Sequence, residues 1–303
     1  MTRAQWIDLP SDLRDRIESI AGARFVSAAT QTGGFSTGVA ARVVFEGGAR
    51  LFVKAVPTAS DGTHGLYARE ADILQALPEG LPAAHLVDAF TQSGWFALVI
   101  EDVDGRHPEP SADSADAVHV LDAIADLASI TAEPSLPALS DELDEDAGSW
   151  HRLEADSLLE ETTPWCVANV ATLQQLASSV GAATTGDRMI HGDLRADNIL
   201  IDASGRVRLL DWPWAARGAG WEDALLYLLD LLVTDPAAPV DPLLDHPVFS
   251  SSTADQEDAL LAAIAGSWFE KCRLPAPPGM MDLRAFQRRE ALTAVDWLAR
   301  RRG

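Results

Sequence analysis

The first third of the chain contains short apolar runs with the length and alternation of β-strands. Residues 39–45 and 50–56 are two such runs, and a glycine-containing turn separates them, which predicts a β-hairpin. Residues 95–100 predict a further strand. Apolar residues recur with helical spacing over residues 11–21 and 65–77, so we predict a helix in each of these two ranges.

A lysine and a glutamate lie on faces that are otherwise apolar. Alternation along the strand 50–56 puts Lys54 on the same face as Phe52. The helix 65–77 carries Glu70 on its apolar face. A buried carboxylate is costly unless it is paired with a cation, and Lys54 is one of only two lysines in the chain. We therefore predict an ion pair between Lys54 and Glu70.

The remainder of the chain has mainly helical periodicity. The predicted helices cover residues 117–130, 169–180, 223–233 and 256–270. Two β-type runs, residues 198–201 and 207–210, interrupt them and are joined by a polar turn. A polar segment that ends at Gly105 separates the two patterns, so we predict an N-terminal lobe of residues 1–102 and a C-terminal lobe of residues 103–303. The predicted fold class is α+β, with a small β-rich N-lobe and a larger, mainly helical C-lobe.

The charge of the chain limits its partners. A formal net charge of −23 opposes binding to nucleic acid or to anionic membranes, because both require basic surfaces. It weakly favours a cationic ligand, although acidic residues that only maintain solubility are the simpler explanation. The acidic segment 134–164 is interrupted by prolines, and we expect it to form a mobile insertion.

The N-terminal residues, the apolar runs and the cysteines do not suggest an extracellular or membrane protein. Residues 1–11 mix charged residues with apolar ones and lack the apolar stretch of a secretory signal. The most apolar helical run, residues 223–233, is about half of the roughly 20 residues that cross a bilayer. Cys166 and Cys272 lie far apart in the sequence, so neither a zinc site nor a disulfide framework is indicated. We expect a cytoplasmic protein with no membrane partner.

The candidate chemistry lies in residues 191–198, which read His-Gly-Asp-Leu-Arg-Ala-Asp-Asn. They match the protein-kinase pattern H-R-D-L-x-x-x-N, except that glycine replaces the arginine. Phosphoryl transfer requires a cradle for phosphates, metal ligands and a carboxylate beside the attacking hydroxyl. In this pattern Asp193 is the predicted catalytic base and Asn198 a predicted ligand of Mg²⁺. Asp211, which ends the apolar run 207–210, is the second predicted metal ligand.

Two further features could contact phosphate groups. The glycine-rich segment before the first strand lacks the spacing G-x-G-x-x-G, so a plain turn is the alternative to a phosphate-binding loop. Its predicted nucleotide-binding residues are Gly33, Gly34, Ser36 and Thr37. Arg195 stands two residues after Asp193, where protein kinases place a lysine near the γ-phosphate, and we predict that it stabilises the transferring charge.

In combination, these motifs resemble the aminoglycoside phosphotransferase family, which is distantly similar to protein kinases and close to choline, fructosamine and homoserine kinase-like enzymes. That family typically has H-G-D in its catalytic loop and variants such as D-W in place of D-F-G, as here in Asp211-Trp212-Pro213. The resemblance implies a bilobal protein-kinase-like fold, in which the N-terminal lobe binds the nucleotide and the C-terminal lobe contains the catalytic loop and the substrate pocket. It also implies Mg²⁺, and ATP as the phosphate donor, with GTP as the alternative. It further implies nucleotide contacts from Lys54, paired with Glu70, adenine contacts from the backbone near Glu101 and Val103, and a bracing role for Asp223.

The resemblance leaves the acceptor open. The first hypothesis is an O-phosphotransferase for an antibiotic, either an aminoglycoside or another secondary metabolite, and the acidic balance of the chain fits a cationic acceptor. The second is a kinase of a primary metabolite, such as a sugar, a choline-like alcohol or an amino-acid alcohol. The third is a nucleotide-binding pseudokinase. All three use the same nucleotide site, so the motifs do not separate the first two from each other.

Overall fold

A computed structural model gives the structure of residues 3–31, 38–60, 62–78, 80–277 and 280–303. The chain forms two compact units. The first comprises Met1–His107, Asp197–Pro213 and Pro278–Met280, and the second comprises Pro108–Ala196, Trp214–Pro277 and Met281–Gly303. The predicted division after residue 102 differs because the segment Asp197–Pro213 belongs to the first unit. The assignment of nucleotide binding to one lobe and of the substrate pocket to the other stays a prediction.

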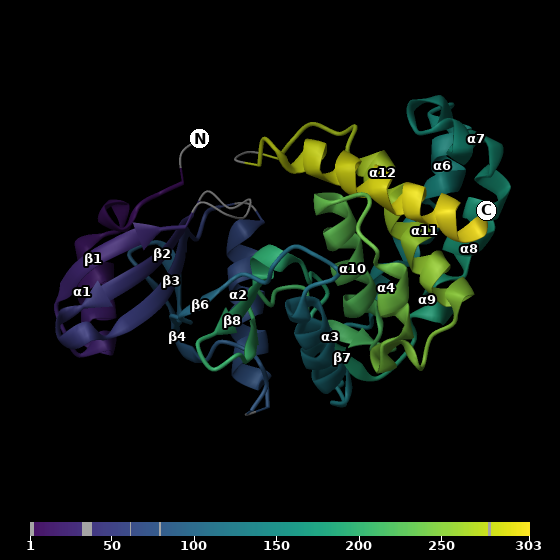
Figure 1. Cartoon of the computed structure of the whole chain (residues 1–303). Coiled ribbons are helices and arrows are strands. Elements are labelled where there is room, and N and C mark those ends of the chain that lie inside the picture. The colour runs from purple at the N-terminus through teal and green to yellow at the C-terminus, as the bar shows by residue number, and fades with distance from the viewer. Residues whose placement is uncertain (1–2, 32–37, 61, 79, 278–279) are drawn as a thin grey trace. The chain divides into compact units, whose positions relative to one another are not determined.

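An antiparallel sheet of five strands forms the centre of the first unit (Figure 1). Its strands are β1 (Phe25–Thr30), β2 (Val39–Phe45), β3 (Arg50–Pro57), β4 (Leu86–Gln92) and β5 (Trp95–Glu101), in the order β1-β2-β3-β5-β4. The helices of this unit are α1 (Ser11–Ala21) and α2 (Thr63–Ala76), with short 3₁₀ turns at Trp6–Asp8 and Glu46–Gly48. The predicted hairpin is present as β2 and β3.

The two faces of the sheet carry different residues. On one face, α1 contributes Leu13 and Ile17 to a core that also contains Val43, Val53 and Val99. The opposite face packs against α2, which contacts β3, β4 and β5. Lys54 alternates with Val53 along β3, so its side chain points to the α2 face, as the sequence predicts.

A smaller sheet completes the first unit. Strand β8 (Ile199–Asp202) pairs with β9 (Val207–Leu209) and with the two-residue strand β6 (Gly105–Arg106), all antiparallel. Backbone bonding ties this hairpin to the loop before β4, because the N–H of Leu209 donates to the carbonyl of Pro82 at 2.5 Å. The hairpin predicted from residues 198–210 is therefore present and belongs to the same unit as the five-stranded sheet.

The second unit is mainly helical. Its helices are α3 (Ala115–Ala128), α4 (Leu139–Glu142), α5 (Asp144–Ala147), α6 (Ser149–Ala155), α7 (Pro164–Ala168), α8 (Val170–Ser178), α9 (Val180–Ala183), α10 (Glu222–Thr234), α11 (Ala254–Lys271) and α12 (Leu283–Arg302). Short 3₁₀ segments lie at Leu159–Glu161, Asp241–Asp245 and Pro247–Phe249, and β7 (Arg188–Ile190) pairs with β10 (Ala216–Gly218). Helix α11 is buried along most of its length and contacts α12, α10 and α8.

The structure corrects the expected mobile insertion and adds elements that the pattern missed. The acidic segment 134–164 is folded: Trp150 of α6 is fully buried, and its Nε1 donates to the carbonyl of Ala262 at 2.8 Å. Strand β1 was missed because most of its side chains are exposed, and β4 because its side chains are mostly only partly buried. Helix α12 was missed because arginines interrupt its apolar pattern.

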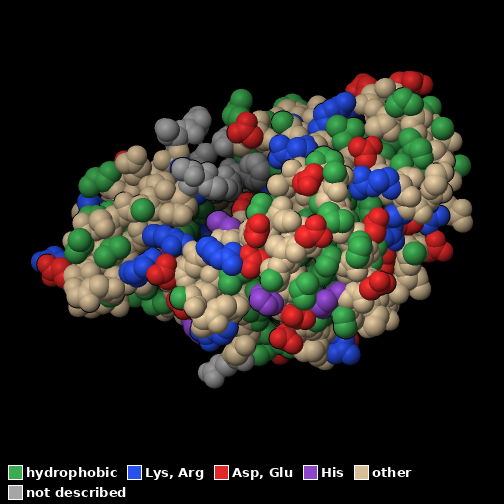
Figure 2. All heavy atoms as spheres, in the orientation of Figure 1, with side chains coloured by type: hydrophobic (Ala, Val, Ile, Leu, Met, Phe, Trp, Pro, Cys, Tyr) green, Lys and Arg blue, Asp and Glu red, His purple; other side chains and the backbone are tan. Residues whose placement is uncertain are grey.

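Charged residues hold α12 against α11. Arg301 donates through Nε to Asp258 at 2.6 Å and through Nη2 to Glu257 at 2.7 Å, and all three side chains are at most 10% exposed. Elsewhere on the surface, acidic side chains are spread in small groups among basic ones on the face in Figure 2. In the described part of the chain, none of the helices is long and apolar enough to cross a membrane.

Removal of a single charge from this buried cluster should lower the stability of the protein strongly. Arg301→Ala leaves two carboxylates that lose a buried partner, so we expect the free energy of unfolding to fall by about 3 kcal/mol in chemical denaturation. The control is Arg273→Ala, because Arg273 pairs with Glu161 at 2.8 Å on the surface and such pairs contribute at most about 1 kcal/mol. Equal losses in the two variants would contradict a structural role for the buried cluster.

Candidate active site

In the first unit, Lys54 lies between two carboxylates. Its Nζ donates to Oε1 and Oε2 of Glu70 at 2.8 and 2.6 Å, and to Oδ1 of Asp211 at 2.8 Å. Lys54 comes from β3, Glu70 from α2, and Asp211 lies two residues beyond β9. The ion pair between Lys54 and Glu70, predicted from strand and helix phase alone, is confirmed. The same contacts bring Asp211 to Lys54, so three predicted site residues meet at one ammonium group.

Burial makes this cluster electrostatically strong. Lys54 is 8% exposed and Glu70 is 1% exposed. Burial alone would lower the pKa of Lys54, but the negative charges of Asp211 and Glu70 outweigh it and raise the pKa above its ordinary value. For Glu70, burial raises the pKa against the attraction of Lys54. The ring of Tyr67 lies 5.7 Å from the ammonium and adds a weak cation–π contact.

The two predicted metal ligands, Asn198 and Asp211, are linked through the hairpin. The N–H of Leu210 donates to the carbonyl of Asn198 at 2.8 Å, which places Asn198 beside the residue that precedes Asp211. Asp211 has a φ of 68°, in the left-handed region that few non-glycine residues adopt. Such strain is commonly retained at functional sites.

The donor set of Asn198 and Asp211 fits Mg²⁺. A carboxamide and a carboxylate provide hard oxygen ligands, and Mg²⁺ usually takes one or two carboxylates together with substrate phosphates and water. No group of three or more His, Cys, Asp or Glu that could hold a metal occurs among the described residues. With Asn198 and Asp211 as its protein ligands, the ion would take its remaining ligands from phosphate oxygens and water.

In the second unit, the loop that follows β7 is held by carboxylates. Asp223, at the start of α10 and 1% exposed, accepts from the N–H of His191 at 2.6 Å and from that of Gly192 at 2.9 Å. Burial raises the pKa of Asp223 to about 6, against these two hydrogen bonds. The contact that the resemblance implied for Asp223 is therefore present. His191 is fully buried, and its Nδ1 lies 3.3 Å from the N–H of Asp193, which agrees with a structural role.

Gly192 explains why this loop has H-G-D in place of H-R-D. Its φ is 82°, and a Cβ added there would lie 2.3 Å from the carbonyl oxygen of Trp214. Any side chain would meet both a backbone clash and a left-handed conformation. The glycine is thus required by local structure, whatever chemistry the loop performs.

A second carboxylate, which the sequence analysis missed, holds the same loop. Asp230 of α10 accepts from the N–H of Ala196 at 2.8 Å. Asp223 and Asp230 are seven residues apart, which is about two helical turns, so they lie on one side of α10. Two carboxylates at this spacing in a helix that is mainly apolar after its first turn are a signal that could have identified both.

Arg195 and Asp193, the predicted catalytic pair, lie close together. Nε of Arg195 is 3.5 Å from Oδ1 of Asp193. The guanidinium of Arg195 lies 4.9 Å from the ring centroid of Phe286 on α12, a helix that the sequence analysis did not identify. The carboxylate of Asp193 therefore has a cation beside it, and the roles of both residues in catalysis stay predictions.

Glu290, one turn after Phe286 on α12, is a buried carboxyl close to this pair. It is 3% exposed, and its Oε1 has no hydrogen-bond partner within the described ranges. Burial raises the pKa of Glu290 to about 8, and the negative charge of Asp230 adds to the effect, while Arg195 opposes it. At neutral pH the side chain is therefore mostly the neutral acid.

Of the remaining predicted nucleotide-binding residues, the structure describes Glu101 and Val103. Glu101 ends β5, and its N–H already donates to the carbonyl of His85 at 2.9 Å. Val103 is 5% exposed. Gly33, Gly34, Ser36 and Thr37 lie outside the described residues. Adenine contacts near Glu101 and Val103 and phosphate contacts from the glycine-rich segment stay predictions.

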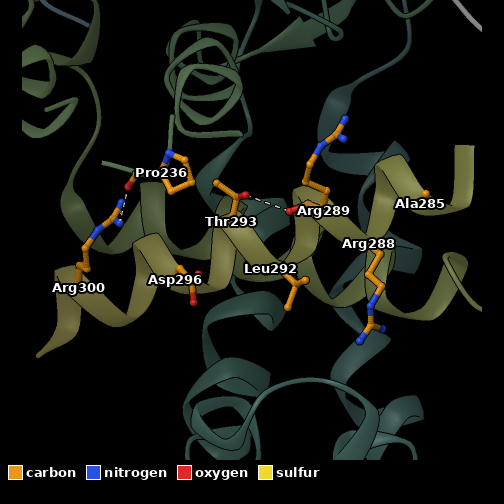
Figure 3. Close-up of a pocket in the computed structure, with 8 residues that line it drawn as sticks. All are labelled: Pro236, Ala285, Arg288, Arg289, Leu292, Thr293, Asp296 and Arg300. Carbon is orange, nitrogen blue, oxygen red and sulfur yellow. Dashed lines mark hydrogen bonds between the residues drawn. The ribbon is translucent and has the colours of Figure 1, made fainter. Parts of the chain in front are cut away.

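A groove of about 300 Å³ runs along α12 in the second unit (Figure 3). It is lined by Pro236, Ala285, Arg288, Arg289, Leu292, Thr293, Asp296 and Arg300. Figure 3 shows Arg288 and Arg289 pointing away from each other, while Arg300 donates to the carbonyl of Pro236 at 3.1 Å. The groove contains no predicted site residue, and its arginines do not converge on one point.

Several solved structures with the same fold carry the names of small-molecule kinases, and their sequence identity to this chain is low. A thermostable mutant of the aminoglycoside phosphotransferase APH(4)-Ia, in a ternary complex with ADP and hygromycin B, matches with a TM-score of 0.62 and 12% identity over 96% of this chain and 98% of that one. Choline kinase from Streptococcus pneumoniae matches with a TM-score of 0.57 and 15% identity over 94% and 98%. A putative fructosamine-3-kinase from Thermobifida fusca matches with a TM-score of 0.58 and 19% identity over 95% and 100%. The fold is therefore protein-kinase-like, as predicted.

Sequence comparison then gives the family. The model of the phosphotransferase enzyme family matches residues 33–249 of the 303. The chain belongs to this family, which confirms the family resemblance drawn from the catalytic-loop and Asp-Trp motifs and makes the protein a phosphotransferase. No curated protein matches the chain by sequence.

Substitution of Gly192 separates the clash at this loop from the general cost of a positive φ. We expect Gly192→Ala to lower turnover about 100-fold, because the loop must move away from Trp214 and its bonds to Asp223 are disturbed. The matched control is Gly205→Ala in the turn of the β8–β9 hairpin, where φ is 85° and nothing lies within 4 Å of an added Cβ. The control should lose about 1 kcal/mol of stability and retain its activity. Similar activity in the two variants would rule out the close approach as the constraint.

Glu290 should make stability depend on pH. The unfolded chain ionises this group near 4.5, whereas the folded protein keeps it protonated to about 8, so stability falls as the pH rises between these values. Glu290→Gln removes the titration. We therefore expect the free energy of unfolding of the variant to rise relative to that of the wild type from pH 5 to pH 8, by at most about 1.4 kcal/mol per unit of pKa shift. Urea denaturation at several pH values measures this difference, with the exposed Glu160→Gln as the control. A difference that does not change with pH would refute the raised pKa.

Proposed function

We propose that the protein transfers the γ-phosphate of ATP to a hydroxyl group of a small molecule, and that the acceptor is an antibiotic, either an aminoglycoside or another secondary metabolite. The observation that carries the phosphotransfer part is the buried ammonium of Lys54 bonded to both Glu70 and Asp211. This arrangement offers a fixed positive charge to phosphate oxygens and a carboxylate to a metal ion in one place.

The roles of the residues follow from their chemistry. Lys54 binds nucleotide phosphates, and Glu70 fixes its position. Asn198 and Asp211 hold Mg²⁺, which when bound neutralises charge on the phosphate oxygens. Asp193 orients the acceptor hydroxyl and accepts its proton, and Arg195 stabilises charge on the transferring group. Asp223 and Asp230 keep the backbone of the loop in place through the N–H groups of His191, Gly192 and Ala196.

Two observations support an antibiotic acceptor. The neighbour APH(4)-Ia was solved with hygromycin B, and the net charge of −23 favours a cationic compound. The competing function is phosphorylation of a primary metabolite, which the similarity to a choline kinase and to a putative fructosamine-3-kinase supports. GTP is the alternative donor in both cases. The complete set of Lys54, Glu70, Asp193, Asn198 and Asp211 speaks against a pseudokinase.

A screen of acceptors tests the proposal. The full chain is incubated with Mg²⁺, ATP or GTP, and a panel of aminoglycosides, other hydroxyl-bearing antibiotics, sugars, choline-like alcohols and amino-acid alcohols, and release of the nucleoside diphosphate is followed by a coupled assay. We expect turnover with an antibiotic. Turnover only with a primary metabolite would overturn the antibiotic assignment, and nucleotide binding without any turnover would favour the pseudokinase.

The same assay tests whether Asp193 is the catalytic base. Asp193→Asn should lower kcat about 10²- to 10⁴-fold, because the amide cannot accept a proton, while the affinity for nucleotide stays within about twofold. Asp187→Asn is the control, since this aspartate is 69% exposed and lies just before β7. If Asp193→Asn retains full turnover, Asp193 is not the base.

A further inference from the structure

Arg208 joins three segments of the first unit through one guanidinium group. Its Nη2 donates to Oε2 of Glu101 at 2.7 Å and to the carbonyl of Ala83 at 2.9 Å, and its Nη1 lies 3.4 Å from Oε1 of Glu101. Glu101 ends β5, Ala83 lies in the loop between α2 and β4, and Arg208 is the middle residue of β9. The side chain of Arg208 is 13% exposed and that of Glu101 is 36% exposed, so the guanidinium is largely shielded from water while the carboxylate is partly solvated.

Backbone contacts surround the same point. Ala83 and Leu209 form a parallel bridge, and the N–H of Leu209 donates to Pro82. The N–H of His85 donates to Oε2 of Glu101 at 3.2 Å. Although burial favours the neutral acid, the hydrogen bonds from Arg208 and from the N–H of His85 hold the pKa of Glu101 below its ordinary value. Glu101 is thus ionised at neutral pH and bound on two sides.

The position of Arg208 connects it to the metal ligands. Arg208 precedes Asp211 by three residues, and the neighbouring strand β8 begins directly after Asn198. At one end of the hairpin, Lys54 holds the side chain of Asp211. Within the hairpin, the side chain of Arg208 connects β9 to Glu101 at the end of β5. The family resemblance places the adenine near this end.

We propose that Arg208 is a positioning residue for the metal–nucleotide complex: by binding Glu101 and the carbonyl of Ala83, it fixes the β8–β9 hairpin, and with it Asn198 and Asp211, against strand β5. This inference rests on the proposed function, because it assumes that the nucleotide and its metal bind to these residues. Arg208 takes part in no chemical step. It acts only by holding the hairpin next to which Asn198 and Asp211 lie.

The same hairpin contains a contrasting arginine. Arg206 pairs with Asp202 at 3.2 Å, but this pair spans only four residues within the turn, and Arg206 is 74% exposed. Among the residues that the structure describes, the side-chain bonds of Arg206 are to Asp202 and Ser204 of the same hairpin. Substitution of Arg206 therefore removes one positive charge from the same hairpin and leaves the contacts of Arg208 in place, whereas the proposed positioning depends on Arg208.

The test compares variants of the full chain in the phosphotransfer assay. We expect Arg208→Ala to raise the KM for Mg·ATP about tenfold with kcat little changed, and to lower the melting temperature, because the bidentate contact is lost while the backbone bridge remains. Arg208→Lys should recover part of the affinity, because one ammonium can reach Glu101 but cannot reproduce the planar contact with the carbonyl. Arg206→Ala should behave as the wild type.

A double-mutant cycle identifies the partner. Glu101→Gln should raise the KM in the same direction, and the double variant of Arg208→Ala and Glu101→Gln should be no worse than Arg208→Ala alone. Additive effects on the KM would mean that the two side chains act independently. That result, or a loss of melting temperature and kcat with an unchanged KM, would overturn the positioning role and leave a structural ion pair.

A direct binding measurement keeps the two proposals distinguishable. Calorimetric titration with Mg²⁺ and a non-hydrolysable ATP analogue reports the affinity without any acceptor. If the wild type binds the analogue but transfers no phosphate, the proposed function fails while the effect of Arg208→Ala on affinity still tests this inference. If the wild type does not bind the analogue, the inference is overturned as well.

Discussion

The structure around the candidate site depends on one buried ammonium group. Lys54 is surrounded by Glu70 and Asp211, and an unpaired charge at this depth would be expensive. Each carboxylate comes from a different part of the sequence, so the ion contacts tie β3, α2 and the segment after β9 together. The arrangement also has a surplus of negative charge, which agrees with a site that is completed by a metal ion. Removing Lys54 would leave the carboxylates of Glu70 and Asp211 without their shared cation, so it would destabilise this region as well as remove the proposed phosphate contact.

The division of the chain into two units separates the predicted site residues into two groups. The catalytic-loop sequence runs from one unit into the other, since Ala196 ends a segment of the second unit and Asp197 begins a segment of the first. Asn198 and Asp211 thus belong to the same unit as Lys54, whereas Asp193 and Arg195 belong to the other. If the proposed function holds, the groups that bind the phosphate donor and its metal form one body, and the groups that act on the acceptor hydroxyl are fixed by α10 and α12 in another. The contacts of Arg208 concern only the first of these bodies.

Sequence reasoning was accurate where a local pattern carries the information. The phase of β3 and of α2 was enough to predict the pair of Lys54 and Glu70, and the H-G-D motif was enough to locate the loop. It missed β1, whose exposed side chains give little hydrophobic signal, and α12, whose arginines are paired with acids of α11. It therefore also missed Phe286 and Glu290, because their proximity to Arg195 follows from packing between distant segments. Arg208 shows the same limit: its neighbours in the sequence give no indication that Glu101 and Ala83 are its partners.

The acidic residues of the chain are more than a solubility device. Asp223 and Asp230 cap backbone N–H groups of the catalytic loop, and Glu222 accepts from the N–H groups of Ala219 and Gly220, each at 2.6 Å. Others, such as Asp258, neutralise buried arginines. A carboxylate that accepts two backbone hydrogen bonds fixes a loop more firmly than a neutral side chain does, because charge-assisted bonds are stronger. Part of the negative charge is therefore structural in origin. The net charge alone is consequently weak support for a cationic acceptor, and the case for phosphotransfer rests on the family and on the geometry around Lys54.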